Sequence, residues 1–248
     1  MSISLGWLYA HKQMASTTTM DDWKGVSLRR AALVAGLGYL LTPTPFAEFY
    51  AYPHLVIPGK IEQTAQNILA HQTLFAVCIL CYLFSYVCDV VIAWALYYLL
   101  KPVSVSLSLL AAWFQLVYTA VGLYASLNLV TVLRLLNTPE DAAMFGAGPL
   151  HAQVRLLLAS FRSSWGLSLV FFAVHLMLVG YLVYKSGYIP KLIGMLLVIA
   201  GVGYVVQNLN AYLFPKPDLG YVAIALLGEL VFMFWLLIRG WKIKESAV

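Results

Sequence analysis

Residues 166–204 constrain the fold of this chain most, because they hold two long apolar runs joined by a short polar turn. Each run is long enough to cross the hydrocarbon core of a bilayer at about 1.5 Å of helical rise per residue. The turn, from Lys185 to Lys191, contains the helix breakers Gly187 and Pro190. Its lysines indicate a cytoplasmic turn, since loops on that side are rich in basic residues. The stretch predicts two membrane spans joined on the cytoplasmic side.

The composition agrees with a membrane protein. Hydrophobic residues make up 62% of the 248 residues and charged residues 10%, against about half and about a quarter in soluble domains. The net charge of +5 does not predict a nucleic-acid partner, because the basic residues sit at helix ends and form no patch interleaved with aromatic residues. Cys78, Cys81 and Cys88 share one apolar run, so no disulfide framework is predicted.

Six apolar runs have the length of a membrane span, and we expect an all-α bundle of six transmembrane helices. Pro43 and Pro45 predict that the outer half of the first run is kinked or unwound. Lys101 and Pro102 are all that separates the second run from the third, so these two helices should be antiparallel neighbours. The expected spans are residues 31–50, 73–100, 103–130, 163–184, 192–213 and 219–238.

The connection between the third and fourth spans should contain more helix. Thr138 followed by Pro139 is typical of a helix start. Apolar residues recur at helical spacing from Leu150 to Phe161, with Arg155 on the other side. This pattern predicts an amphipathic helix on the outer membrane surface that runs into the fourth span.

Charge counting predicts that both termini are cytoplasmic, since ten of the 15 lysines and arginines would then lie inside. Residues 1–28 would form a cytoplasmic extension, residues 29–241 the membrane domain and residues 242–248 a cytoplasmic tail. The first 22 residues lack the pattern of a signal peptide. Met14 and Met20 offer later translation starts than Met1.

Ionisable groups inside the spans are the candidate functional residues, because such groups are expensive in hydrocarbon and mark functional sites. Asp89, His175 and Glu229 lie 16, 12 and 10 residues into the second, fourth and sixth spans, all running in the same direction. Their depths agree within about 10 Å by helical rise. We expect Glu229 to pair with His175 first and with Asp89 next. These three residues are the catalytic candidates, and Gln115 and Asn208 complete the predicted ligand-binding set.

Two other interpretations of the three groups stay open. They can form a satisfied buried network with a purely structural role, or they can hold a metal ion. Three scattered ligands give little support for a metal, and we predict none. The sequence shows no phosphate-binding loop, nucleophile elbow or dinucleotide fingerprint, and no cofactor is predicted.

Several motifs resemble a known family: Leu110 to Val117 in the third span, Phe171 to Leu176 in the fourth, the turn from Tyr184 to Pro190, and Gly228-Glu229-Leu230 in the last span. Over roughly residues 29–241 the chain resembles the bacterial six-helix membrane proteins catalogued as domain of unknown function 4386. The resemblance implies a multi-pass protein of the bacterial inner membrane. That family has no established activity, so the resemblance concerns fold and location.

Three functions fit the sequence. The favoured one is binding or transport of a hydrophobic or amphiphilic small molecule in a polar pocket within the membrane. The second is an acid–base enzyme acting on an isoprenoid or lipid. The third is an accessory or regulatory subunit, for which Gly194 and Gly201 would form a face for helix association. The expected partners are membrane lipids, a hydrophobic small molecule, and further copies or other subunits.

Overall fold

A computed structural model describes residues 26–138, 146–213 and 221–243, with side chains for all of these except 210–213 and 221–226. Every element within these ranges is helical. The elements are α2 (Leu28–Leu41), α3 (Thr44–Phe46), the π-helix η1 (Ala47–Ala51), α4 (Tyr52–Leu55), α5 (Ile61–Ala70), α6 (Gln72–Leu100), α7 (Val105–Asn137), α9 (Ala147–Ser186), α10 (Lys191–Leu213), α11 (Tyr221–Arg239) and the 3₁₀-helix η2 (Gly240–Lys242).

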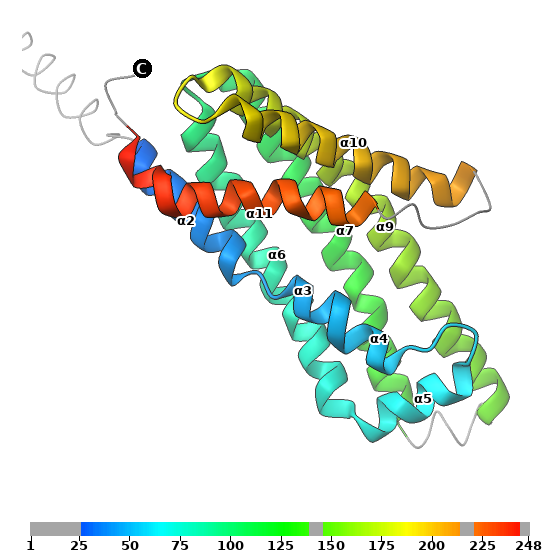
Figure 1. Ribbon diagram of the computed structural model, residues 1–248. Coiled ribbons are helices and arrows are strands. Elements are labelled where there is room, and N and C mark those ends of the chain that lie inside the picture. Colours follow the sequence, from blue (N-terminus) through cyan, green and yellow to red (C-terminus); the bar gives the residue numbers. More distant parts are fainter. Residues whose placement is uncertain (1–25, 139–145, 214–220, 244–248) are drawn as a thin grey trace, which may run out of the picture.

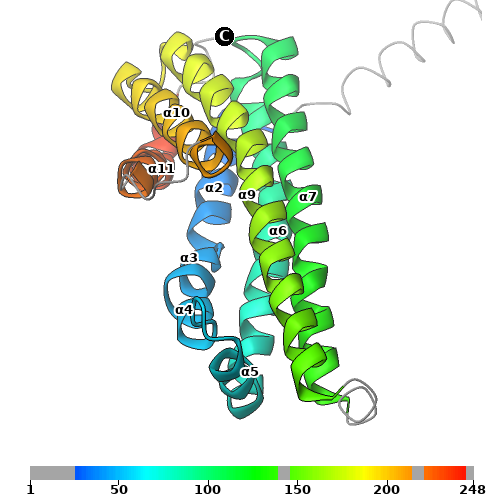
Figure 2. The same cartoon turned by 90° about the vertical axis from the view of Figure 1, so that its right-hand side faces the viewer.

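Three long helices, α6, α7 and α9, lie side by side and form the frame of the molecule (Figures 1 and 2). The predicted tight hairpin between the second and third spans is confirmed, because α6 and α7 pack against each other across a four-residue connection. Ser104 caps the start of α7 by accepting a hydrogen bond from the Leu107 N–H. Large apolar side chains such as Phe84 and Trp113 are exposed on the outer faces of these helices, as contact with lipid requires.

The expected surface helix and the fourth span are one continuous helix of 40 residues, α9. At 1.5 Å per residue it is about 60 Å long, roughly twice the thickness of the hydrocarbon core. The apolar face predicted for its first part is present, but Val154 and Phe161 are fully buried against protein. This part of α9 therefore packs into the bundle, where α5 contacts it. The helix start expected at Pro139 lies outside the described residues.

The first apolar run does not form a single span. α2 ends at Leu41, Thr42 is extended, and Pro43 precedes the short α3 and η1. The predicted break at the prolines is confirmed, because Pro43 cannot continue a helix and also disfavours helical backbone at the residue before it. After the break the chain turns onto α6, where η1 packs. The π-helix η1 carries Glu48.

The helices α10 and α11 cross the long helices obliquely near one end of the bundle (Figures 1 and 2). Glycines on α10 let its backbone approach the backbone of α9 closely, because they have no side chain between the two helices. A Cβ atom at Gly194 would lie 2.5 Å from the carbonyl oxygen of Gly180, and one at Gly201 would lie 2.7 Å from that of Ala173. Gly194 and Gly201 were predicted to form a face for association with another protein. In the structure this face packs against α9 of the same chain.

Within the described residues, four helices have the length and apolar character of a membrane span, namely α6, α7, α9 and α10 over Lys191–Leu209. α2 has 14 residues, about 21 Å, which is too short to cross a bilayer alone. Part of α11 falls on residues whose side chains are not described. The membrane nature of the chain is therefore supported, while the number of six spans stays a prediction.

Candidate ligand-binding cavity

A cavity of about 410 Å³ opens between the long helices and the broken N-terminal segment. This volume lies within the usual range of small-molecule sites, about 300–1,000 Å³. Side chains from all the main helices reach it, most of them apolar or aromatic. The lining residues are Tyr39, Thr42, Thr44, Pro45, Glu48, Phe49, Asp89, Tyr118, Arg162, Trp165, Leu169, Phe172, Tyr204, Gln207, Asn208, Glu229, Leu230 and Met233.

An ion pair forms part of the cavity wall. Arg162 on α9 donates from Nη1 to Glu48 Oε2 at 2.8 Å and to Oε1 at 3.1 Å. The hydroxyl of Tyr82 also donates to Glu48, and the Arg162 guanidinium lies 4.0 Å from the ring centroid of Tyr52. The Glu48 carboxylate is therefore neutralised and hydrogen-bonded within the chain.

A second carboxyl comes from Asp89 on α6. Gln115 on α7 donates from Nε2 to Asp89 Oδ1 at 3.1 Å. Gln115 is fully buried and does not line the cavity, so it holds Asp89 from behind. This contact depends on the tight hairpin between α6 and α7, which keeps the two helices adjacent along their length.

The third carboxyl, Glu229 on α11, has a different partner from the one predicted. Tyr204 on α10 donates its hydroxyl to Glu229 Oε1 at 2.9 Å. His175 Nδ1 instead lies 2.8 Å from the carbonyl oxygen of Ala111 on α7, and must donate to it because a carbonyl only accepts. The predicted Glu229–His175 pair is thus not observed. Close packing of α10 on α9 brings a tyrosine to the position that was predicted for the histidine.

The cavity unites three of the five predicted ligand-binding residues: Asp89, Asn208 and Glu229. Gln115 acts indirectly through Asp89, and His175 is fully buried outside the cavity, with its ring stacked on Phe172 at a centroid distance of 5.9 Å. The predicted ligand-binding set omits most of the lining residues, including three that form the ion pair and the tyrosine hydrogen bond of the wall. These are Glu48, Arg162 and Tyr204.

Three fully buried polar atoms of lining residues have no hydrogen-bond partner within the described part of the chain. They are the hydroxyl of Tyr39, the indole Nε1 of Trp165 and the amide oxygen of Gln207. Buried polar atoms in folded proteins are nearly always satisfied. Donor and acceptor atoms left open around a cavity are what a bound molecule would use.

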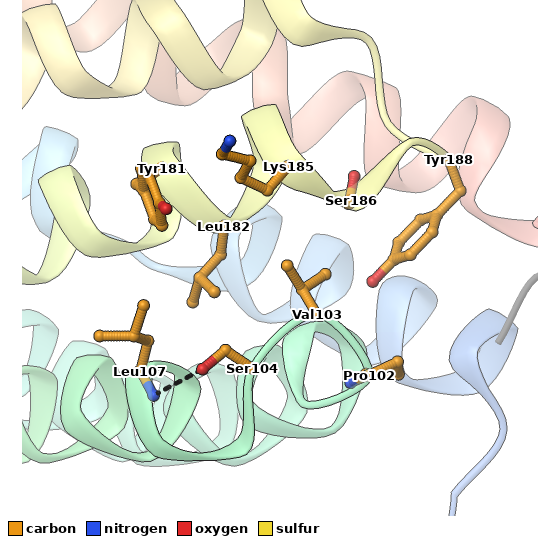
Figure 3. A pocket seen from close by; sticks show the side chains of 9 residues that line it. All are labelled: Pro102, Val103, Ser104, Leu107, Tyr181, Leu182, Lys185, Ser186 and Tyr188. Carbon is orange, nitrogen blue, oxygen red and sulfur yellow. Dashed lines mark hydrogen bonds between the residues drawn. The ribbon is translucent and has the colours of Figure 1, made fainter.

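Two other hollows lie at the end of the bundle that carries basic residues. One, of about 540 Å³, is lined by the α6–α7 connection and the end of α9 (Figure 3). Tyr188 comes from the turn after α9 (Figure 3). Its hydroxyl donates to the Leu99 carbonyl oxygen at 2.5 Å. Burial raises the pKa of Tyr188 to about 12, so it stays a neutral donor. Its neighbour, of about 500 Å³, contains Lys191, Arg239 and Lys242.

Among the described residues that line these two hollows, none is acidic. The cavity that contains Asp89 and Glu229 is therefore the better candidate site, because it combines apolar walls with several converging polar groups. Among the residues that the structure describes, no three histidine, cysteine or acidic side chains are grouped so that they could hold a metal ion.

Comparisons with known proteins identify a family and one similar protein. A family model described as domain of unknown function (DUF4386) matches residues 34–240. An uncharacterized protein of Archaeoglobus fulgidus is 36% identical over 157 residues, which are 63% of this chain and 80% of that protein. No solved structure matches the chain.

Proposed function

The chain belongs to the DUF4386 family, and we propose that it is a membrane protein that binds a hydrophobic or amphiphilic small molecule in the cavity lined by Glu48, Asp89 and Glu229. The observation that carries this proposal is the cavity itself. Three carboxyl groups and an arginine face one space inside an otherwise apolar bundle. Ionisable groups at such a position are costly, and their usual role is to meet a substrate, an ion or a ligand.

The shape of the wall supports passage of the ligand as well as binding. Thr42, Thr44 and Glu48 line the cavity at the point where the first apolar run is broken by Pro43. Broken helices whose freed backbone and side chains face a cavity recur at the binding sites of membrane transporters. The acid–base enzyme has less support, because His175 lies outside the cavity and Asp89 and Glu229 would have to act without it.

Ligand binding predicts a gain in thermal stability. The protein purified in a neutral detergent should melt at a higher temperature with one or more lipid-soluble metabolites. A ligand at about 100 times its Kd adds about 2.7 kcal/mol to the free energy of unfolding. Asp89→Asn and Glu229→Gln should reduce this gain, whereas Glu62→Gln, on the exposed face of α5 away from the cavity, should keep it. The proposal fails if no compound stabilises the wild type more than the two cavity variants.

We further propose that the protein lies in the bacterial cytoplasmic membrane with both termini inside. Arg29 donates from Nε to the Ile243 carbonyl oxygen at 2.8 Å, which supports both termini lying on the same side. The turn after α9 lies at the same end, because Tyr188 contacts Leu99 and shares a hollow with Lys242. This end collects most of the lysines and arginines expected inside.

The orientation can be measured by cysteine labelling in intact cells. In the Val248→Cys variant, a membrane-impermeant maleimide should leave the new thiol unlabelled until the cells are opened. In Lys60→Cys, a change in the connection expected outside, the thiol should be labelled from the start. The wild type is the blank, since Cys78 and Cys88 are buried and Cys81 is half-buried. Labelling of the Val248→Cys variant in intact cells would reverse the proposed topology.

A further inference from the structure

We infer that the ligand carries a positive charge, as a protonated amine or a quaternary ammonium group attached to an apolar body. The inference rests on the proposed function, because it names the chemical class that the same cavity accepts. It follows from the unequal numbers of acidic and basic side chains in the wall. It also follows from where the aromatic rings lie relative to the acids.

The charges that line the cavity do not cancel. Glu48 is paired with Arg162 at 2.8 Å, and Arg162 is the one lysine or arginine in the described wall. Among the described residues, the hydrogen-bond partners of Asp89 and Glu229 are Gln115 and Tyr204, which are both neutral. A buried carboxylate needs a positive partner or must give up its charge. A cationic ligand would supply that partner to two acids at once.

Both acids are held so that part of each carboxyl group remains open to an occupant. Gln115 binds Oδ1 of Asp89, and Tyr204 binds Oε1 of Glu229. Among the described residues, the structure shows no hydrogen bond to the second oxygen of either group. Each acid is therefore oriented by a neutral donor and keeps one oxygen for a cation. In a pre-formed anionic site, neutral donors fix the orientation of each carboxyl group, and the other carboxyl oxygen is left to contact the ligand.

Three aromatic rings line the cavity beside Glu229. Tyr118, Phe172 and Tyr204 come from α7, α9 and α10 and form one wall, with centroid distances of 5.0 Å between the first two and 5.6 Å between the last two. Tyr204 belongs both to this wall and to the hydrogen bond with Glu229. Ring faces attract cations, and aromatic cages are the usual receptors for quaternary ammonium groups.

The remaining wall is suited to an apolar body. Phe49, Leu169, Leu230 and Met233 line the cavity, and its volume of about 410 Å³ is far larger than a single metal ion requires. An organic cation therefore fits the space better than an inorganic one. The ligand class that satisfies charge, rings and volume together is a lipophilic ammonium compound.

The test compares two probes of the same shape. Benzyltrimethylammonium carries the charge, and neopentylbenzene replaces its nitrogen by carbon and is neutral. In thermal-shift titrations of the full-length protein in neutral detergent, the cation should bind at least about tenfold more tightly, as expected of a desolvated cation–π and ion-pair contact. Benzenesulfonate, an anion of similar size, should bind more weakly than both. This comparison uses the wild type and needs no variant to fold.

Variants then assign the effect to the two acids. Asp89→Asn and Glu229→Gln keep the shape of each side chain, and each should lower affinity for the cation about tenfold while leaving neopentylbenzene unchanged. Glu62→Gln should change neither. Equal binding of the cation and neopentylbenzene, or tighter binding of the anion, would overturn the cationic ligand and leave the proposed function standing. If no probe and no lipid-soluble metabolite stabilises the protein, both the inference and the proposed function fail.

Discussion

Gly194→Leu is expected to lower the free energy of unfolding by about 3 kcal/mol, at the upper end of the usual cost of overpacking. A Cβ atom there would lie 2.5 Å from the Gly180 carbonyl oxygen and 2.7 Å from the Tyr184 nitrogen. Both obstacles are backbone atoms, which cannot rotate away as a flexible side chain can. The leucine would therefore push α10 off α9. The melting temperature of the purified protein measures the loss.

The matched control for this prediction is Gly148→Leu on α9. Gly148 is exposed, and a Cβ atom there would meet no atom of the described residues within 4 Å. Its substitution should change the free energy of unfolding by less than about 0.5 kcal/mol. The Gly194 variant should also bind amphiphiles more weakly, because α10 carries Tyr204, which holds Glu229. Equal melting temperatures for the two leucine variants would show that the close packing of α9 and α10 does not stabilise the protein.

Local signals in the sequence were sufficient to predict the turn between α9 and α10 and the hairpin between α6 and α7. The turn between α9 and α10 runs from Gly187, which has a φ of 74°, to Pro190. A left-handed backbone after a helix favours glycine, and proline suits the position before the next helix. The hairpin at Lys101 and Pro102 was equally predictable, because so short a connection leaves the following helix no other neighbour.

The predicted pair of His175 and Glu229 was wrong because depth along a helix does not give distance between helices. The expected His175–Glu229 pair assumed that the spans stand parallel. α11 in fact crosses the long helices obliquely (Figure 1), so equal residue counts do not bring side chains together. The proximity of Asp89 to Gln115 was easier to predict, because the hairpin holds α6 and α7 side by side.

Glu48 and Arg162 show a further limit of sequence reasoning. They lie 114 positions apart, and no periodicity connects them. Glu48 reaches Arg162 because the chain breaks at Pro43 and η1 then packs on α6. The sequence showed the break, but not the direction in which the chain continues after it. That direction depends on tertiary packing.

Arg162→Met is expected to lower the free energy of unfolding by about 2 kcal/mol. Breaking a fully buried pair costs about 3–5 kcal/mol, and a smaller value is expected here because the Arg162 side chain is 38% exposed. The loss arises because the Glu48 side chain, 13% exposed, would keep the Tyr82 hydroxyl but lose its cation. Arg155→Met, on the exposed face of the same helix, is the control and should change stability by less than about 0.5 kcal/mol.

The double variant tells whether the pair itself is responsible. Glu48→Gln alone leaves the Arg162 guanidinium without its carboxylate, although the ring of Tyr52 still lies 4.0 Å from it. Removing both charges leaves neither group unpaired, so the double variant should lose at least about 1 kcal/mol less than the sum of the two single losses. Chemical denaturation in mixed micelles gives the three free energies. Strictly additive losses would mean that the two groups stabilise the protein separately, and that the cavity wall does not depend on their contact.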